Sequence, residues 1–79
     1  MTMKLTNQSE AVAEAILDIM EMEGGMGASL KEICKETGLH SKIVRGNLGD
    51  LVKKGIVDVD PKKVSGAAYD MFYHKDYVA

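Results

Sequence analysis

The sequence has little of what distinguishes secreted, repetitive or membrane proteins. It contains one cysteine, Cys34, so no disulfide can form within the chain, and a lone cysteine fits a reducing compartment. Low-complexity tracts are absent, and no apolar run approaches the roughly 18 residues that a membrane-spanning helix needs. Residues 1–6 lack the apolar segment of a secretion signal. We therefore expect a cytoplasmic protein without membrane contact.

An excess of positive charge is also missing, although nucleic-acid-binding domains are usually basic. The 79 residues carry 10 basic and 12 acidic side chains, a formal net charge of −2. The two signs are nevertheless separated along the chain. Residues 1–30 hold one lysine against five acids, whereas residues 31–63 hold eight basic side chains against five acids. This separation is compatible with one face that meets phosphate and another that faces away from it.

Residues 8–23 are predicted to form an amphipathic helix. Val12 and Ile16 belong to an apolar series at helical spacing, and acidic side chains occupy the opposite face. Asn7 is the expected N-cap, and a glycine-rich stretch over residues 24–27 ends the helix. Nearby methionines are expected to fill gaps in the core, although a methionine-rich patch can also be a partner groove. These methionines are Met20, Met22 and Met26.

A short second helix is predicted over residues 30–37. Ser29 and Glu32 have the spacing of a capping box, in which each side chain bonds the backbone N–H of the other residue. Gly38 can adopt the left-handed conformation that closes a helix, and a tight turn follows it. A helix this short is marginal alone, so it must be held by packing against its neighbours.

The third helix is predicted over residues 42–54. Ser41 is its expected N-cap, and Gly55 is expected to close it. An apolar stripe runs along one side of this helix and anchors it to the core. The stripe consists of Val44, Leu48, Leu51 and Val52.

After Gly55 the apolar period changes from helical to alternating. Residues 56–60 form a β-branched run, and Pro61 is expected to limit its continuation. The aromatic content of residues 67–76 favours a returning strand, although the first six of these residues can also begin a short helix. A hairpin over residues 56–76 is therefore predicted, with Pro61 to Gly66 as its loop.

This order of elements resembles the winged helix-turn-helix DNA-binding regulators. The resemblance covers residues 8–77 and is closest to MarR-like and ArsR-like regulators and to small phage or plasmid regulators of the same fold. It depends on the capped short helix with its small Cys34, on the glycine turn, and on Leu-Val-Lys-Lys-Gly-Ile-Val at residues 51–57. It implies an α+β fold: residues 1–79 as a single winged-helix domain of three helices followed by a β-hairpin wing.

The resemblance also implies that the third helix enters the major groove of double-stranded DNA. Arg45 can offer two donors to guanine, and Asn47 can pair twice with adenine. Lys62 and Lys63 in the wing are expected on the DNA backbone or in the minor groove, although each lysine is equally well a solvated charge. The full set of candidate DNA-binding residues is Ser41, Lys42, Arg45, Gly46, Asn47, Lys62 and Lys63.

Gly46 and Gly49 are unusual inside a helix, where each glycine costs about 1 kcal/mol relative to alanine. One explanation is close approach of the helix backbone to DNA or to another helix. The alternatives are a frayed helix, or packing against a large neighbour such as Tyr73. We favour close approach.

No spacing in the sequence is typical of a catalytic or metal site. Cys34 is expected in the core and His40 on the surface, and neither is near His74 in the sequence. Asp58 and Asp60 fit the exposed face of a strand better than a catalytic pair. We therefore expect no enzyme activity, no cofactor and no metal.

The main functional hypothesis is a DNA-binding transcriptional regulator. One reading helix contacts only a few base pairs, so we expect a homodimer on a two-fold site, paired through the first helix or through residues 69–77. The alternative is a winged-helix protein-interaction module, for example a phage or plasmid factor acting on RNA polymerase or another host protein. The acidic first helix and the negative net charge favour that alternative.

Overall fold

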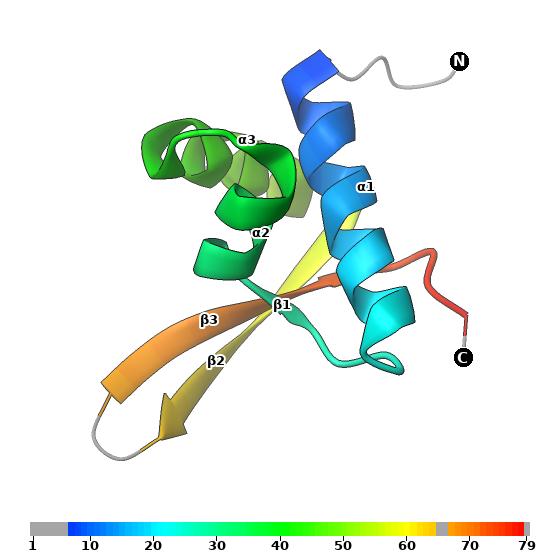
Figure 1. Ribbon diagram of the computed structural model, residues 1–79, viewed down its shortest axis with the longest axis vertical. Coiled ribbons are helices and arrows are strands. Elements are labelled where there is room, and N and C mark those ends of the chain that lie inside the picture. The colour runs from blue at the N-terminus through cyan, green and yellow to red at the C-terminus, as the bar shows by residue number, and fades with distance from the viewer. Residues whose placement is uncertain (1–6, 65–66, 79) are drawn as a thin grey trace.

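The computed structural model describes residues 7–64 and 67–78, with side chains described for residues 8–60 and 70–78. Within these ranges the chain forms three α-helices and one antiparallel sheet of three strands (Figure 1). The elements are α1 (Asn7–Met22), β1 (Ala28–Ser29), α2 (Leu30–Thr37), α3 (Ser41–Lys53), β2 (Val57–Val64) and β3 (Ala67–His74). The predicted α+β winged-helix fold, three helices followed by a hairpin, is confirmed.

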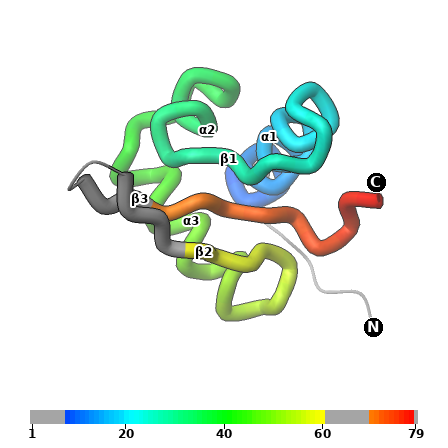
Figure 2. Tube along the Cα trace, turned by 90° about the horizontal axis from the view of Figure 1, so that it is seen from below, coloured from blue at the N-terminus to red at the C-terminus, as the bar shows by residue number. Residues whose placement is uncertain are grey.

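The hairpin of β2 and β3 extends away from the helices, which pack together on one side of its base (Figures 1 and 2). Residues 67–74 form a strand throughout, so the alternative of a short helix there is wrong. Each helix begins and ends within about one residue of its expected range.

The helix caps agree with the sequence prediction at α2 but differ at the other helices. At α2, Glu32 N donates to Ser29 Oγ at 3.2 Å and Ser29 N donates to Glu32 Oε1 at 3.0 Å. Asn7 is already the first residue of α1 rather than its cap. At α3 the cap is His40, not Ser41: its backbone is extended and its Nδ1 accepts from Lys42 N at 3.2 Å.

Pro61 does not end the first wing strand, which continues to Val64. The strand order is β1-β3-β2, so β2 lies at an edge of the sheet. A proline has no N–H to donate, and an edge strand can turn that position away from its neighbour. Pro61 therefore pairs with Asp70 inside the hairpin, and residues 61–64 belong to β2 and not to the expected loop from Pro61 to Gly66.

The strand β1 was not predicted, because two residues are too few to show a period. Its pairing joins Ala28 to Phe72 and Ser29 to Met71. Beside it, the ring of Tyr73 lies so close to Gly27 that an added Cβ would be 2.7 Å from its Cζ. The glycine that packs against Tyr73 is thus Gly27, not a glycine of α3.

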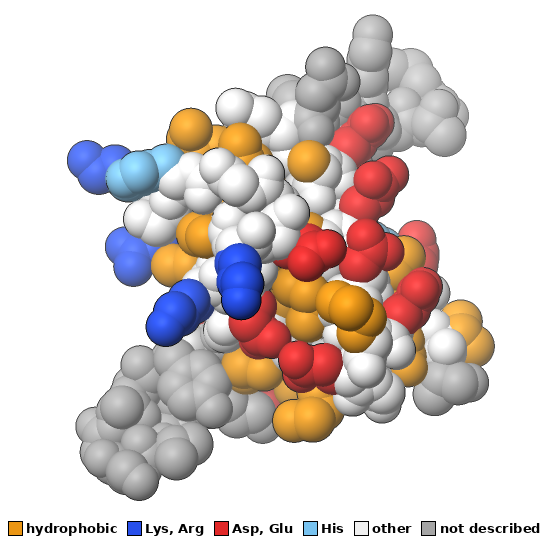
Figure 3. Space-filling model, viewed as in Figure 1, with side chains coloured by type: hydrophobic (Ala, Val, Ile, Leu, Met, Phe, Trp, Pro, Cys, Tyr) orange, Lys and Arg blue, Asp and Glu red, His pale blue; other side chains and the backbone are white. Residues whose placement is uncertain are grey.

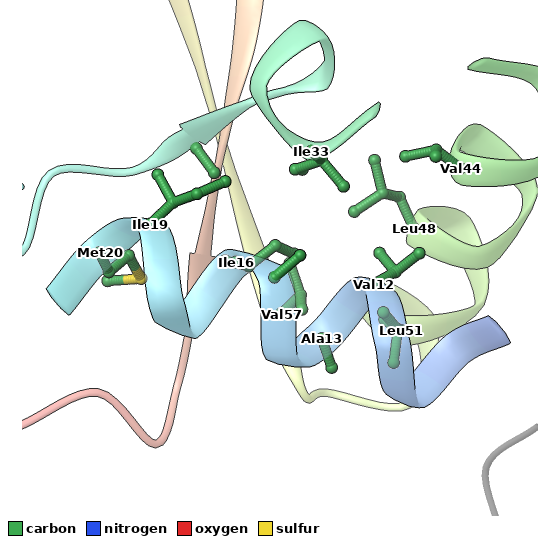
Figure 4. Packing of buried hydrophobic residues seen from close by; sticks show 12 residues of the cluster. Val12, Ala13, Ile16, Ile19, Met20, Ile33, Val44, Leu48, Leu51 and Val57 are labelled. Carbon is green, nitrogen blue, oxygen red and sulfur yellow. The ribbon is translucent and has the colours of Figure 1, made fainter. Parts of the chain in front are cut away.

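The core lies where α1, α2, α3 and the base of the hairpin meet (Figure 4). Its largest fully buried side chains include Ile16, Ile33 and Leu51, one from each helix. Cys34 is half-buried against this core, close to its expected place. No helix in the described ranges has the length and apolar character that crossing a membrane requires.

The methionines were only partly predicted. Met20 is buried at 4% exposure, and its Sδ accepts a hydrogen bond from His74 N at 3.1 Å. Met22 and Met26 are 70% and 63% exposed, so the expectation that they fill the core is wrong. They lie at the last residue of α1 and in the loop that follows it.

Candidate nucleic-acid interface

The buried residues of α3 determine which of its residues face outward. Val44, Leu48 and Leu51 are fully buried, which fixes the side of the helix that faces the core. With 3.6 residues per turn, the opposite side carries Lys42, Gly46, Gly49 and Lys53, all of them exposed. The outward side of α3 therefore has a lysine at each end, Lys42 and Lys53, and only glycines between them.

Arg45 is exposed on the side of α3 that faces the hairpin. It lines an open groove of about 830 Å³ between α3, the start of α2 and the wing. The groove has an apolar floor that includes Leu48, Val52 and Phe72. Lys31 of α2 adds a second cation to its lining, and Asp70 of β3 adds one acid. Lys31 was not predicted, because its position relative to the hairpin depends on how α2 and α3 pack. Lys53 was missed although the helical period of α3 places it on the outer surface.

The single acid of α3 is neutralised by its neighbour. Asp50 lies on the flank of the helix, and Lys54 Nζ is 2.9 Å from its Oδ2, an i,i+4 ion pair. The cations of the outer surface keep their net positive charge as a result. On the face that Figure 3 shows, Lys and Arg side chains lie over α2 and α3, and most Asp and Glu side chains lie over α1 and the neighbouring part of α2.

Asn47 does not face outward with the other candidates. Its Oδ1 accepts from the buried Ser9 Oγ of α1 at 2.7 Å, and its Nδ2 donates to the Ile43 carbonyl at 2.8 Å. The sequence contained the signal, since Asn47 is three residues after Val44 and four before Leu51, which places it beside the apolar stripe. The expected outward orientation is wrong, and the amide joins α3 to α1.

At the N-terminal end of α3, side chains are available to bind a ligand, whereas the backbone amides of residues 42–44 already donate to His40. Ser41 is half-buried and Lys42 is exposed, both at the start of the helix as expected. The backbone N–H groups of Ile43 and Val44 both donate to the His40 carbonyl at 3.0 Å. A phosphate near this end would therefore meet the Lys42 ammonium first.

Gly46 and Gly49 do not pack against anything in the described part of the chain. A Cβ added at either position would have no atom within 4 Å, apart from its own helix and chain neighbours. The helix is continuous through both residues. The open space beside them gives no support to packing against a large neighbour and leaves room for close approach of another molecule.

Lys62 and Lys63 lie on the part of β2 that is far from the helices. Their backbones pair with Tyr69 and Ala68 of β3. Their side chains lie outside the described residues, so their placement on DNA stays a prediction.

Chemistry other than binding has no support among the described side chains. No group of three or more His, Cys, Asp or Glu residues in that part of the chain is arranged to hold a metal ion. His40 is exposed as expected, and its ring nitrogen caps α3.

Comparisons with known proteins identify relatives of this fold. A family model described as "LexA DNA binding domain" matches residues 2–66, which end before β3 begins. Among solved structures, Stf76 from the Sulfolobus islandicus plasmid-virus pSSVx superposes with a TM-score of 0.66 at 18% identity. The superposition covers 84% of this chain and 83% of that chain, and at this identity it shows a shared fold. No curated protein matches the sequence.

Proposed function

This chain belongs to the LexA DNA-binding domain family, and we propose that it is a transcriptional regulator that reads the major groove of double-stranded DNA with α3. The family confirms the predicted winged helix-turn-helix type. Within that type the sequence resemblance named MarR-like and ArsR-like regulators or a small phage or plasmid regulator, and did not name LexA. A regulator of this kind acts on DNA in the cytoplasm and needs no catalytic group.

The observation that carries this proposal is the outer surface of α3. An α-helix fits the major groove, which is roughly 12 Å wide, and its outward side chains then meet base edges. Arg45 has the length and the paired donors to bind guanine O6 and N7, and Lys42 and Lys53 are placed for phosphate. We retain Ser41, Lys42, Arg45 and Gly46 as candidate contacts and assign Asn47 to the fold.

The groove between α3 and the hairpin supports a second set of contacts. When α3 lies in the major groove, the hairpin extends toward the neighbouring backbone or minor groove. Lys31 at the start of α2 lines this groove, and Lys62 and Lys63 belong to the hairpin strand β2. We propose these three lysines as phosphate contacts, which add affinity without sequence information.

A homodimer on a two-fold site remains part of the proposal, because one α3 reads only a few base pairs. A symmetric contact through α1 is disfavoured by charge, since Glu10, Glu14, Asp18 and Glu21 all lie along it and none is buried. Of the two expected dimer contacts this leaves residues 69–77, and we propose that two copies bind adjacent half-sites on DNA and pair there. Sedimentation of the protein with and without a selected duplex tests this.

Titration of a labelled random duplex at two salt concentrations tests DNA binding itself. Each phosphate contact should contribute a slope of about −0.9 to log K against log salt. On a duplex selected for tight binding, Arg45→Ala should cost about 1–3 kcal/mol, because it removes a bidentate base contact. Lys75→Ala, which removes the same charge just beyond the end of β3, is the matched control.

Two outcomes would contradict the proposal. Absence of binding to any duplex at about 50 mM salt would exclude DNA as the partner, since electrostatic affinity is greatest there. Equal losses in Arg45→Ala and Lys75→Ala would exclude α3 as the reading element and leave only a diffuse charge effect.

A further inference from the structure

A second concave surface lies between the C-terminal end of α1 and α2, apart from the outer surface of α3. We call it the α1–α2 pocket; its volume is about 380 Å³. Its lining residues are Ile19, Met22, Glu23, Glu32, Lys35 and Glu36. None of these residues belongs to α3, so occupation of this pocket leaves the outer surface of α3 accessible.

The floor and one wall of the α1–α2 pocket are apolar. Ile19 is buried beneath it, while Met22 on its wall is 70% exposed. Met26, in the loop after α1, is a second exposed methionine close in sequence. Methionine side chains are flexible and polarisable, and they are frequent on surfaces that adapt to partner segments. Neither Met22 nor Met26 is buried in the core of this domain.

The edge of the α1–α2 pocket is acidic. Among the described side chains that line it, Glu23, Glu32 and Glu36 outnumber Lys35. Repulsion from the Glu32 carboxylate, with a hydrogen bond between the two side chains, raises the pKa of Glu23. A lysine or arginine brought between these two carboxyl groups would relieve that repulsion. Figure 3 shows hydrophobic side chains bordered by acidic ones over this part of α1.

We propose that the α1–α2 pocket docks a basic, amphipathic segment of another protein. An apolar side chain of that segment packs on Met22 and Ile19, and a lysine or arginine lies between Glu23 and Glu32. This inference does not depend on DNA binding by α3. Together the two surfaces would allow the domain to hold a basic partner while it is bound to DNA.

Charge argues for this occupant over two others. Nucleic acid is repelled by the same carboxylates that attract a basic segment. A second copy in a two-fold contact would bring acidic pocket against acidic pocket, since a two-fold interface places the same surface on both sides. A second copy could instead bind the pocket with its own basic surface. The cations of its α2 and α3 would then no longer be available for DNA.

The test uses a labelled amphipathic peptide of leucine and lysine, titrated into the protein by fluorescence anisotropy. Glu23→Lys and Met22→Ser should each weaken binding about tenfold, the usual effect of losing a central contact. Glu10→Lys, the same charge reversal at the other end of α1, is the matched control and should change affinity little. Both Glu23 and Met22 are exposed, so these variants should fold, which circular dichroism checks.

A second peptide, with serine in place of leucine, separates docking from general charge attraction. It should bind much more weakly than the leucine peptide, and amide NMR shifts caused by the leucine peptide should include Met22 and Lys35 but not Arg45. Equal losses in Glu10→Lys and Glu23→Lys, or an unaltered affinity in Met22→Ser, would overturn the proposal. A concentration-dependent dimer of the protein alone that Glu23→Lys disperses would also overturn it, and would assign the pocket to a second copy.

Discussion

At the scale of single residues, substitution of Asn47 distinguishes a structural role in the fold from a role in DNA contact. Asn47→Ala removes its hydrogen bond to Ser9 and should lower the free energy of unfolding by about 0.5–1.5 kcal/mol. Urea denaturation followed by circular dichroism measures this loss. If Asn47 instead contacts adenine, the variant would keep its stability and lose DNA affinity, which contradicts a role in joining α3 to α1.

The Glu23 carboxyl gives a prediction about pH. Its pKa is raised in the folded protein by Glu32, so ionisation of Glu23 destabilises the fold near neutral pH. Glu23→Gln should therefore unfold at a higher temperature than the parent protein at about pH 7. The difference should shrink as the pH falls through the raised pKa and disappear once Glu23 is protonated in the unfolded chain as well. Thermal melts of both proteins across this range measure it, and a difference that persists in acid would rule out this cause.

The sequence predicted those residues whose role is decided by near neighbours in the chain. The capping box of Ser29 and Glu32 spans one helical turn, so its spacing alone was sufficient. The cap at His40 was missed because histidine is rarely a cap, and serine next to it was the better candidate by residue type. Met22 is two residues after the buried Met20, and residues at that spacing do not share a helix face, so the helical period already indicated its exposure.

At the scale of elements, α3 carries two glycines that its own packing does not need. Gly46→Ala and Gly49→Ala should each stabilise the protein by about 1 kcal/mol, because alanine favours helix and its methyl group meets no neighbour. If α3 approaches DNA closely, the same substitutions should weaken DNA binding. Thermal melts and duplex titrations of the same variants measure the two effects together. Higher stability with unchanged or tighter DNA binding would refute close approach.

The helices were easier to predict than the sheet, and the reason is physical. Helix signals repeat within one segment, so α1, α2 and α3 were visible from the sequence. A strand is defined by its partner: the position of β2 at the sheet edge, which allows it to pass Pro61, depends on β3 and β1. For the candidate DNA-binding surface, the apolar stripe of α3 was sufficient to predict the outward side of that helix. The contribution of Lys31, on another helix, was not predicted.

At the scale of the whole molecule, the separation of charge should orient the protein on DNA. The acidic side chains of α1 repel phosphate, while the cations of α2 and α3 attract it. Removing two acids from α1, in Glu14→Gln with Asp18→Asn, should therefore strengthen binding to random duplex at low salt. The gain should vanish at high salt, where charges more than a Debye length apart are screened. Titrations of parent and variant at both salt concentrations measure this, and a gain that survives high salt would contradict long-range repulsion.

Ser29, in the two-residue strand β1, belongs both to the sheet and to the N-terminal cap of α2. Ser29 pairs with Met71 of the hairpin, and its hydroxyl and amide both bond Glu32 at the start of α2. Separation of the hairpin from β1 would therefore also disturb the first turn of α2. Amide hydrogen exchange at the base of the hairpin and at the start of α2 should then follow a common opening event, so that the wing and the helix-turn-helix unfold as one cooperative unit.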